Sequence, residues 1–207
     1  MRIARFVQRN RGHVLRWFII LAVGTFLLRL HYSDDPWTPE GVAAEALLSM
    51  EMPPAQIHTM IESEDSIFAA LLYDEVHGLF HQMFMSRSYG LLWVHRGGGF
   101  GNKLNPDTLI SFRMGMSTLD KRYHYYYAGQ VHDPNVVRLR IVWPDGLEQI
   151  TEPRDNLYMV IRSFSLKDPA SENVWDSKLY AYDSGGNLLY ELNAQTQEIQ
   201  RQQLPSS

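Results

Sequence analysis

Residues 136–143, which read VVRLRIVW, decide the fold class of this chain. Apolar and basic side chains alternate along this stretch: Val137, Leu139 and Ile141 are apolar, and Arg138 and Arg140 are basic. Successive side chains of a β-strand point to opposite faces of its sheet, so the alternation predicts a strand with one buried and one solvated face. We expect the apolar side chains to face inward and the arginines to face outward.

Similar short runs of strand-forming residues lie on both sides of this stretch. Their ranges are 67–73, 79–85, 89–95, 108–114, 123–128, 147–151, 157–164, 178–183 and 188–192. Turn-forming residues such as Pro144-Asp145-Gly146 separate them. Many short strands at regular spacing predict a mainly β domain at residues 64–195, an antiparallel β-sandwich or open barrel that folds alone. The Gln-rich residues 196–207 are expected to form a flexible tail.

Residues 33–63, which precede this domain, are predicted to form an acidic helical stalk. Thr38 is a typical N-cap for a helix at residues 38–50, and a second short helical turn is expected at 55–61. Residues 34–75 contain ten acidic side chains and no Lys or Arg. A charge run of this kind usually forms a solvated surface, and the alternatives are capture of cations and docking onto a basic partner.

An arginine-rich head runs directly into an apolar block at the N-terminus. The first 31 residues contain six arginines and no acid, and the stretch 17–28 is uncharged. We expect residues 1–13 to be a cytoplasmic basic tail and residues 14–32 to be a transmembrane signal anchor in the lipid bilayer. The alternatives are a helix buried in a soluble protein and a cleaved signal peptide, although no A-x-A-like site follows Leu28.

The charge distribution also predicts where the remaining residues lie. The basic side of an anchor stays in the cytoplasm, so a single-pass cell-membrane protein with residues from about 33 onward outside the cell is expected. Without the head, 13 basic residues stand against 23 acidic ones. An acidic domain outside the cell does not suit nucleic acid, and we expect no nucleic-acid partner.

Several sequence patterns accompany this anchor. An apolar strand ends in Tyr73-Asp74-Glu75, residues 90–94 have the pattern G-L-x-W-V, and V-x-L-R-I and YAYDSGGN follow near the C-terminus. Over about two-thirds of the chain, this order resembles a group of uncharacterised single-pass membrane proteins from Bacillus-like Gram-positive bacteria. The resemblance implies a cell-surface location and an extracytoplasmic β domain. It implies no activity, because it includes no chemically specific motif.

Two local patterns approach known binding motifs without matching them. His77 and His81 have the i, i+4 spacing of zinc ligands, but the glutamate of H-E-x-x-H is absent and a strand would separate them by about 13 Å. Residues 96–103, RGGGFGNK, fit no phosphate-binding loop. We expect a flexible strand connection there, and the alternative is a ligand-facing loop that uses Arg96 or Lys103. Neither a metal nor a cofactor is predicted.

A tyrosine-rich strand is the most attractive functional surface in the sequence. On a strand, Tyr123, Tyr125 and Tyr127 share one face, whereas His124 and Tyr126 share the other. Three large aromatic side chains at period two favour a sheet interior, so we expect these three tyrosines to be buried. His124 and Tyr126 are then expected to be exposed and available to a partner, next to the arginines of residues 136–143 if the strands are neighbours.

The function predicted from these patterns is binding rather than catalysis. The expected binding residues are His124, Tyr126, Arg138, Arg140, Arg96 and Lys103. The chain has no cysteine, no G-x-S-x-G elbow and no Ser-x-x-Lys pair, so no catalytic residue is predicted. We expect a membrane-anchored extracytoplasmic binding or scaffolding protein with a protein or cell-wall partner. The alternative is a cell-surface hydrolase that acts on wall or peptide substrates.

Overall fold

The computed structural model of the chain describes residues 11–31 and 35–201 and is mainly β, as the sequence predicts. Within these ranges the α-helices are α2 (Arg11–His31) and α3 (Pro39–Ser49). The strands are β1 (Gln56–Glu62), β2 (Ile67–Asp74), β3 (Leu79–Ser88), β4 (Leu92–Lys103), β5 (Thr108–Ser111), β6 (Arg113–Leu119), β7 (Arg122–Gln130), β8 (Arg138–Val142), β9 (Glu148–Thr151), β10 (Leu157–Ser165), β11 (Lys178–Tyr182), β12 (Leu188–Leu192) and β13 (Glu198–Gln200). Neighbouring strands in these sheets pair antiparallel.

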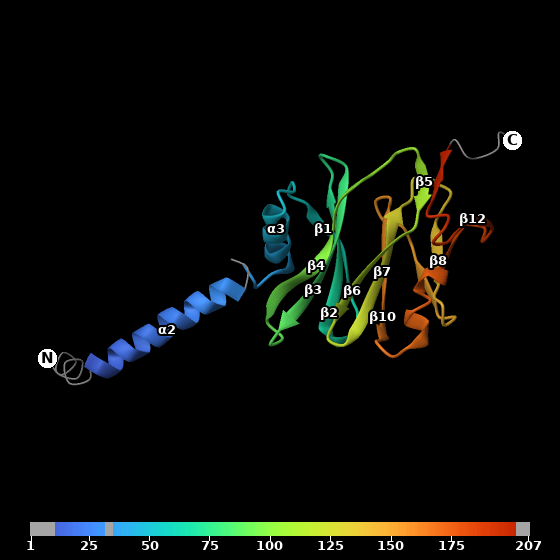
Figure 1. The fold of residues 1–207 in the computed structure, drawn as a ribbon. Helices are drawn as coiled ribbons and strands as arrows, with labels where there is room; N and C mark the ends of the chain where they lie inside the picture. The colour runs from blue at the N-terminus through green and yellow to red at the C-terminus, as the bar shows by residue number, and fades with distance from the viewer. Residues whose placement is uncertain (1–10, 32–34, 202–207) are drawn as a thin grey trace.

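The strands stack in layers behind helix α3 (Figure 1). A first sheet has the order β1-β2-β3-β4, a middle sheet β10-β7-β6, and an outer sheet β12-β11-β8-β9, while β13 pairs with β5. Apolar clusters join α3 to one face of the first sheet, the other face of the first sheet to the middle sheet, and the far face of the middle sheet to the outer sheet. Strands β7 and β10 of the middle sheet are therefore buried on both faces, whereas the edge strand β6 is partly exposed.

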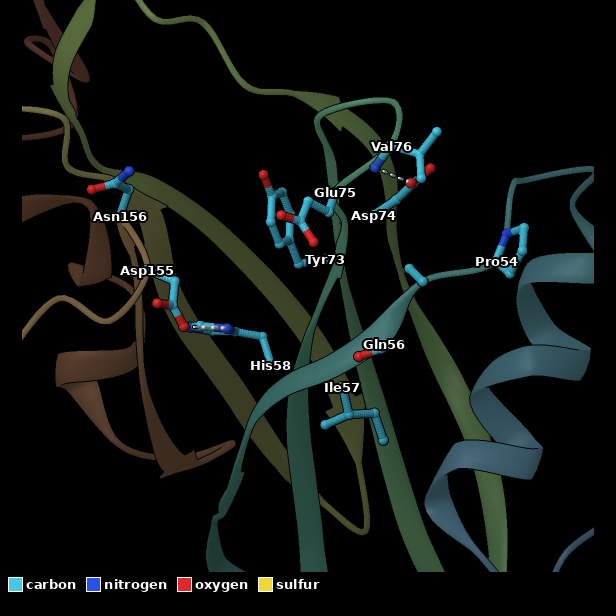
Figure 2. A pocket seen from close by; sticks show the side chains of 11 residues that line it. Pro54, Gln56, Ile57, His58, Tyr73, Asp74, Glu75, Val76, Asp155 and Asn156 are labelled. Atoms are coloured by element: carbon cyan, nitrogen blue, oxygen red, sulfur yellow. Dashed lines mark hydrogen bonds and ion pairs between the residues drawn. The ribbon is translucent and has the colours of Figure 1, made fainter.

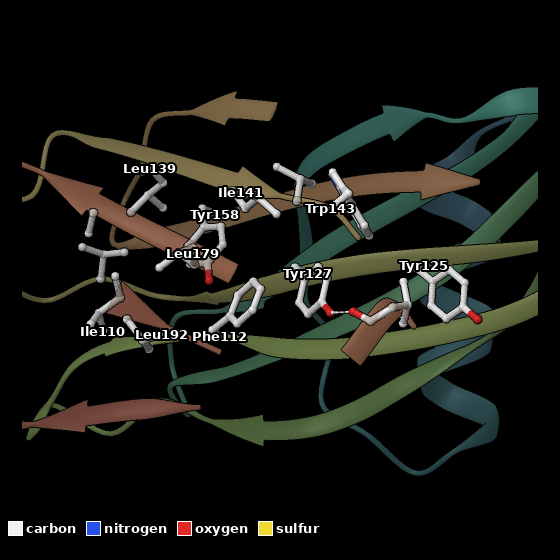
Figure 3. Packing of buried hydrophobic residues seen from close by; sticks show 14 of the residues in the cluster. Ile110, Phe112, Tyr125, Tyr127, Leu139, Ile141, Trp143, Tyr158, Leu179 and Leu192 are labelled. Atoms are coloured by element: carbon white, nitrogen blue, oxygen red, sulfur yellow. Dashed lines mark hydrogen bonds between the residues drawn. The ribbon is translucent and has the colours of Figure 1, made fainter. Parts of the chain in front are cut away.

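The core between the middle and outer sheets is rich in aromatic side chains (Figure 3). The ring of Tyr127 stacks on Phe112 with 4.0 Å between the ring centroids and lies 5.2 Å from Trp143. The Tyr127 hydroxyl donates a 2.8 Å hydrogen bond to the carbonyl oxygen of Val174. This bond satisfies the hydroxyl group of Tyr127, so the side chain can be buried in the core without an unpaired polar atom.

Strand β8 confirms most of the alternation predicted for residues 136–143. Leu139 and Ile141 are fully buried, whereas Arg138 is exposed and Arg140 is partly exposed. The prediction that Val137 faces inward is wrong, because 42% of this residue is exposed. Val137 precedes the first residue of β8, so the two-residue period of the strand does not yet fix its direction.

The predicted stalk is part of the folded domain. Thr38 is the N-cap of α3, as predicted, and its side chain accepts a 3.0 Å hydrogen bond from the Gly41 N–H. Helix α3 buries four apolar side chains, Val42, Ala43, Ala46 and Leu47, against the first sheet. The helical turn predicted at residues 55–61 is wrong, because residues 56–61 belong to β1. The domain boundary predicted at residue 64 is also wrong, because it would separate β1 from β2, with which β1 pairs in the first sheet. Strand β2 is apolar on both faces and needs a cover on each, which α3 provides on one side.

The glycine-rich residues 96–103 lie within strand β4, so the flexible connection predicted there is wrong. A Cβ atom at Gly98 would collide with the carbonyl oxygen of Gln82 on the neighbouring strand β3. Glycine is therefore needed at this position for close approach of two strands. The flexible tail predicted at residues 196–207 is also wrong where β13 pairs with β5, while residues 202–207 lie outside the described residues.

Helix α2 exposes its apolar side chains, and Figure 1 shows it extending away from the sheets. Every large apolar side chain between Val14 and Leu28 is more than half exposed. Within residues 11–31 and 35–201, no helix is long and apolar enough to cross a membrane. The transmembrane helix predicted at residues 14–32 is therefore not confirmed, and residue 32 lies outside the described residues.

Candidate functional site

The two predicted binding residues of the tyrosine-rich strand are buried. His124 is fully buried and Tyr126 is only 7% exposed, so the prediction that they face a partner is wrong. Both belong to β7, which lies between β10 and β6, whereas Arg138 and Arg140 belong to β8 in the outer sheet. The predicted burial is confirmed for Tyr125 and Tyr127, whereas Tyr123 is only partly buried. The first sheet covers the second face of β7, and the alternation along one strand could not indicate this additional layer.

The predicted residues on β4 remain exposed but do not form a phosphate site. Arg96 and Lys103 lie near opposite ends of the glycine-rich stretch, in strand rather than loop. The Arg96 Nε donates a 2.7 Å hydrogen bond to Ser86 Oγ, which fixes this side chain along the edge of the first sheet. The structure therefore does not bring these two residues together with the arginines of β8.

The histidines with zinc-like spacing have separate structural roles. His77 Nδ1 lies 2.7 Å from a carboxylate oxygen of Asp74, at the turn after β2. His81 is fully buried in β3, and its Nδ1 accepts a 3.0 Å hydrogen bond from the Gly101 N–H. Within the described part of the chain, no group of three or more His, Cys, Asp or Glu side chains could hold a metal ion.

Arginine and tyrosine side chains alternate across the solvent face of β8 and β11. The guanidinium carbon of Arg140 lies 4.8 Å from the ring centroid of Tyr180 and 5.6 Å from that of Tyr182. Arg138 lies 5.2 Å from the Tyr182 ring. The strand register places Arg140 opposite Tyr180 and Arg138 opposite Tyr182. We call these four residues the Arg–Tyr face; the cation–π contacts order its guanidinium groups before any partner arrives.

The two arginines of the Arg–Tyr face differ in their polar partners. Arg140 Nη1 donates a 3.2 Å hydrogen bond to Glu148, whereas its Nε is buried and has no hydrogen-bond partner among the described residues. In the same part of the chain, no salt bridge involves Arg138. Arg138 lines an open groove of about 460 Å³ beside the 183–186 turn. The apolar side chains of Ile150 and Leu188 flank the face and are more than half exposed.

A second groove, of about 770 Å³, lies between the start of β1, the end of β2 and the turn before β10 (Figure 2). Its charged groups are mostly acidic, namely Asp74, Glu75 and Asp155. Figure 2 shows His58 directed toward Asp155, and His58 Nδ1 lies 3.8 Å from the Asp155 carboxylate. The groove therefore differs in charge from the Arg–Tyr face.

Asp74 stabilises the turn beside this groove. Its carboxylate accepts hydrogen bonds of 3.0 and 3.2 Å from the N–H groups of Val76 and His77, as well as the 2.7 Å contact with the His77 ring. Burial by itself raises the pKa of Asp74, but the hydrogen bonds from His77 and Val76 outweigh burial, and the pKa lies below its ordinary value. A carboxylate with these partners is not free to accept a proton from a substrate.

A chain of hydrogen bonds, which no sequence pattern indicates, links the first and middle sheets. Ser163 Oγ lies 2.7 Å from His124 Nδ1, and Ser63 Oγ is in short hydrogen-bond contact with Ser163 Oγ. Ser63 follows β1, whereas His124 and Ser163 are paired on β7 and β10. The three residues are far apart in sequence, so no spacing motif could have identified them.

Comparisons with known proteins do not assign the chain to a family. No family model matches the chain, and no curated protein matches it. The resemblance to single-pass proteins of Gram-positive bacteria therefore stays an expectation.

Proposed function

We propose that this protein is a membrane-anchored binding protein whose Arg–Tyr face binds an acidic segment of a partner protein outside the cell. The observation that carries the proposal is the ordered pair of guanidinium groups at Arg138 and Arg140 on an exposed sheet face. Planar guanidinium groups match the geometry of carboxylates, and prior ordering reduces the entropy lost on binding. Exposed Ile150 and Leu188 supply apolar contacts beside them.

Membrane attachment is proposed through residues 14–32. The support is the exposed apolar surface of α2, together with the arginines that precede and close the apolar block. Exposed apolar side chains of this number are unfavourable in water and favourable in lipid. Because arginines favour the cytoplasmic side, the sheets are proposed to lie outside the cell.

Addition of a protease to intact cells tests the location. We expect the protease to digest residues 35–201 without disruption of the membrane. Replacement of Arg2, Arg5, Arg9 and Arg11 by Glu should reduce this digestion in intact cells, because the orientation of the anchor is then no longer favoured. Complete protection of the sheets in intact cells, with digestion after lysis, would contradict the proposed orientation. Recovery of the full chain in the soluble fraction would contradict attachment itself.

Binding of fluorescent poly-glutamate to the purified full chain tests the ligand chemistry. We expect the double variant Arg138→Gln and Arg140→Gln to weaken binding by about tenfold or more, because charge-assisted hydrogen bonds are lost. The matched control is Arg96→Gln with Lys103→Gln, which removes the same charge from an exposed edge of β4. If the two double variants weakened poly-glutamate binding equally, the attraction would depend on net charge alone, and the assignment of the Arg–Tyr face would be overturned. Preference for a polyphosphate probe would identify an anionic wall polymer instead of an acidic protein.

The hydrolase alternative is favoured by one observation, which is the hydrogen-bond chain that ends at His124. This chain lies between the first and middle sheets, away from the Arg–Tyr face of the outer sheet. The two sites can therefore be tested independently.

A further inference from the structure

The direction of the hydrogen bonds at His124 follows from its neighbours. His124 Nε2 lies 3.3 Å from the carbonyl oxygen of Leu119, which can only accept, so Nε2 carries the hydrogen. The Nδ1 atom of the neutral ring then has a free lone pair and accepts from the Ser163 hydroxyl. Ser163 has a single hydroxyl hydrogen, which it donates to His124, so it must accept from the Ser63 hydroxyl.

The chain of hydroxyl groups leads from the protein surface to a buried base. His124 is fully buried and Ser163 is 9% exposed, whereas Ser63 is half-buried. Asp65 and Ser66, which follow Ser63, both adopt the left-handed conformation with φ of 58° and 57°. They form the tight turn between the paired strands β1 and β2, and Asp120 and Lys121 adopt the same conformation between β6 and β7.

We propose that Ser63 is a reactive nucleophile that hydrolyses uncharged carboxylic esters, with His124 as the base that acts through Ser163. The arrangement has the order nucleophile, bridging hydroxyl and base, within hydrogen-bond reach at each step. Glu62, Glu64 and Asp65 lie beside Ser63 in sequence. Arg122 pairs with Glu64 and Asp65, and the net charge that remains is negative and disfavours an anionic substrate. Ser63 and Ser163 are catalytic residues in this proposal, and His124 is a positioning residue.

The proposed reaction balances without a further reactant except water. The Ser63 oxygen bonds to the acyl carbon while its proton moves to Ser163 and the Ser163 proton moves to His124 Nδ1. The bond to the alcohol oxygen then breaks, and the leaving alkoxide takes one proton back along the same chain. Water attacks the acyl-serine in the same way, releases the carboxylic acid and restores the Ser63 hydroxyl.

The pH dependence of the site follows from the surroundings of His124. Burial lowers the pKa of His124, the Leu119 carbonyl and the charges of Asp65 and Asp120 raise it in part, and Arg122 lowers it, so the pKa lies below its ordinary value of 6.5. The base is therefore neutral at pH 7. Reactivity of Ser63 should be constant above this pKa and fall as the pH falls through it.

Labelling of the purified full chain with a fluorophosphonate probe tests the proposal, with the modified residue located by mass spectrometry. We expect the label on Ser63, no label in Ser63→Ala, and a rate about 100-fold lower in Ser163→Ala, which cuts the path to the base. The matched control is Ser66→Ala, an exposed serine on the same turn, which should label at the wild-type rate.

Two further readouts separate reactivity from a structural role. The labelling rate of the wild type should fall at acid pH with the dependence of a single protonation. Ser163→Ala should remove this pH dependence. Circular dichroism and the thermal midpoint should show that the variant keeps its fold. Hydrolysis of p-nitrophenyl acetate should show a burst equal to the protein concentration. Absence of labelling in the folded wild type would overturn the proposal. Equal labelling rates in wild type and Ser163→Ala would overturn the role of the hydrogen-bond chain.

Discussion

Strands β7 and β8 have the same two-residue period but different surroundings. On β8, Leu139 and Ile141 pack into the core, while Arg138 and Arg140 face solvent. On β7, both sets of side chains are buried, one against the outer sheet and one against the first sheet. Alternation of side chains therefore indicates a strand, whereas the number of layers that cover it depends on residues elsewhere in the chain.

The largest expected effect is loss of folding when α3 and β1, which cover and extend the first sheet, are removed. A chain that begins at residue 35 keeps α3 and β1 and should unfold cooperatively in urea. A chain that begins at residue 64 loses both and leaves the apolar outer face of β2 without α3, so we expect it to aggregate or to remain unfolded. A cooperative urea transition of similar midpoint in the shorter chain would show that the stalk predicted at residues 33–63 is dispensable after all.

The second expected effect concerns the face of β7 that the sequence assigned to solvent. Tyr126→Ala should lower the free energy of unfolding by about 3–5 kcal/mol, because it leaves a cavity against Phe84 and the first sheet. Chemical denaturation provides the measurement, and Tyr125→Ala on the opposite face is the comparison. A large loss for Tyr125→Ala with almost none for Tyr126→Ala would restore the exposed His124–Tyr126 pair and contradict the middle layer.

The residues that were predicted correctly depend on local physical chemistry. Thr38 caps a helix through its own neighbours, and the burial of Ile141 follows from the period of a single strand. The residues that were missed depend on distant contacts. Tyr126 is buried by the first sheet, and Gly98 is required because β3 approaches closely. Ser63 meets Ser163 only when the first sheet packs on the middle sheet. One sequence carries no direct record of these contacts.

The third expected effect tests the buried side of β8. Ile141→Ala should lower the free energy of unfolding by about 2–5 kcal/mol, since the side chain is fully buried between the outer and middle sheets. Ile150→Ala on the adjacent strand β9 is the control, because Ile150 lies opposite Arg140 on the solvent face and should change stability by about 0.5 kcal/mol or less. Similar losses for the two isoleucines would mean that the register of the outer sheet is wrong.

The smallest expected effect on stability is on the solvated side of β8, where the proposed binding lies. Arg140→Ala should lower the free energy of unfolding by about 1 kcal/mol or less, because an exposed ion pair with Glu148 and cation–π contacts contribute little each. A double-mutant cycle with Tyr180→Phe and Tyr180→Ala separates the contributions: the coupling should persist with phenylalanine, which keeps an aromatic ring, and disappear with alanine. If Arg140→Ala destabilised the protein as much as Ile141→Ala, Arg140 would be a core residue. The comparison between the two faces of β8 would then fail, and with it the proposed binding face.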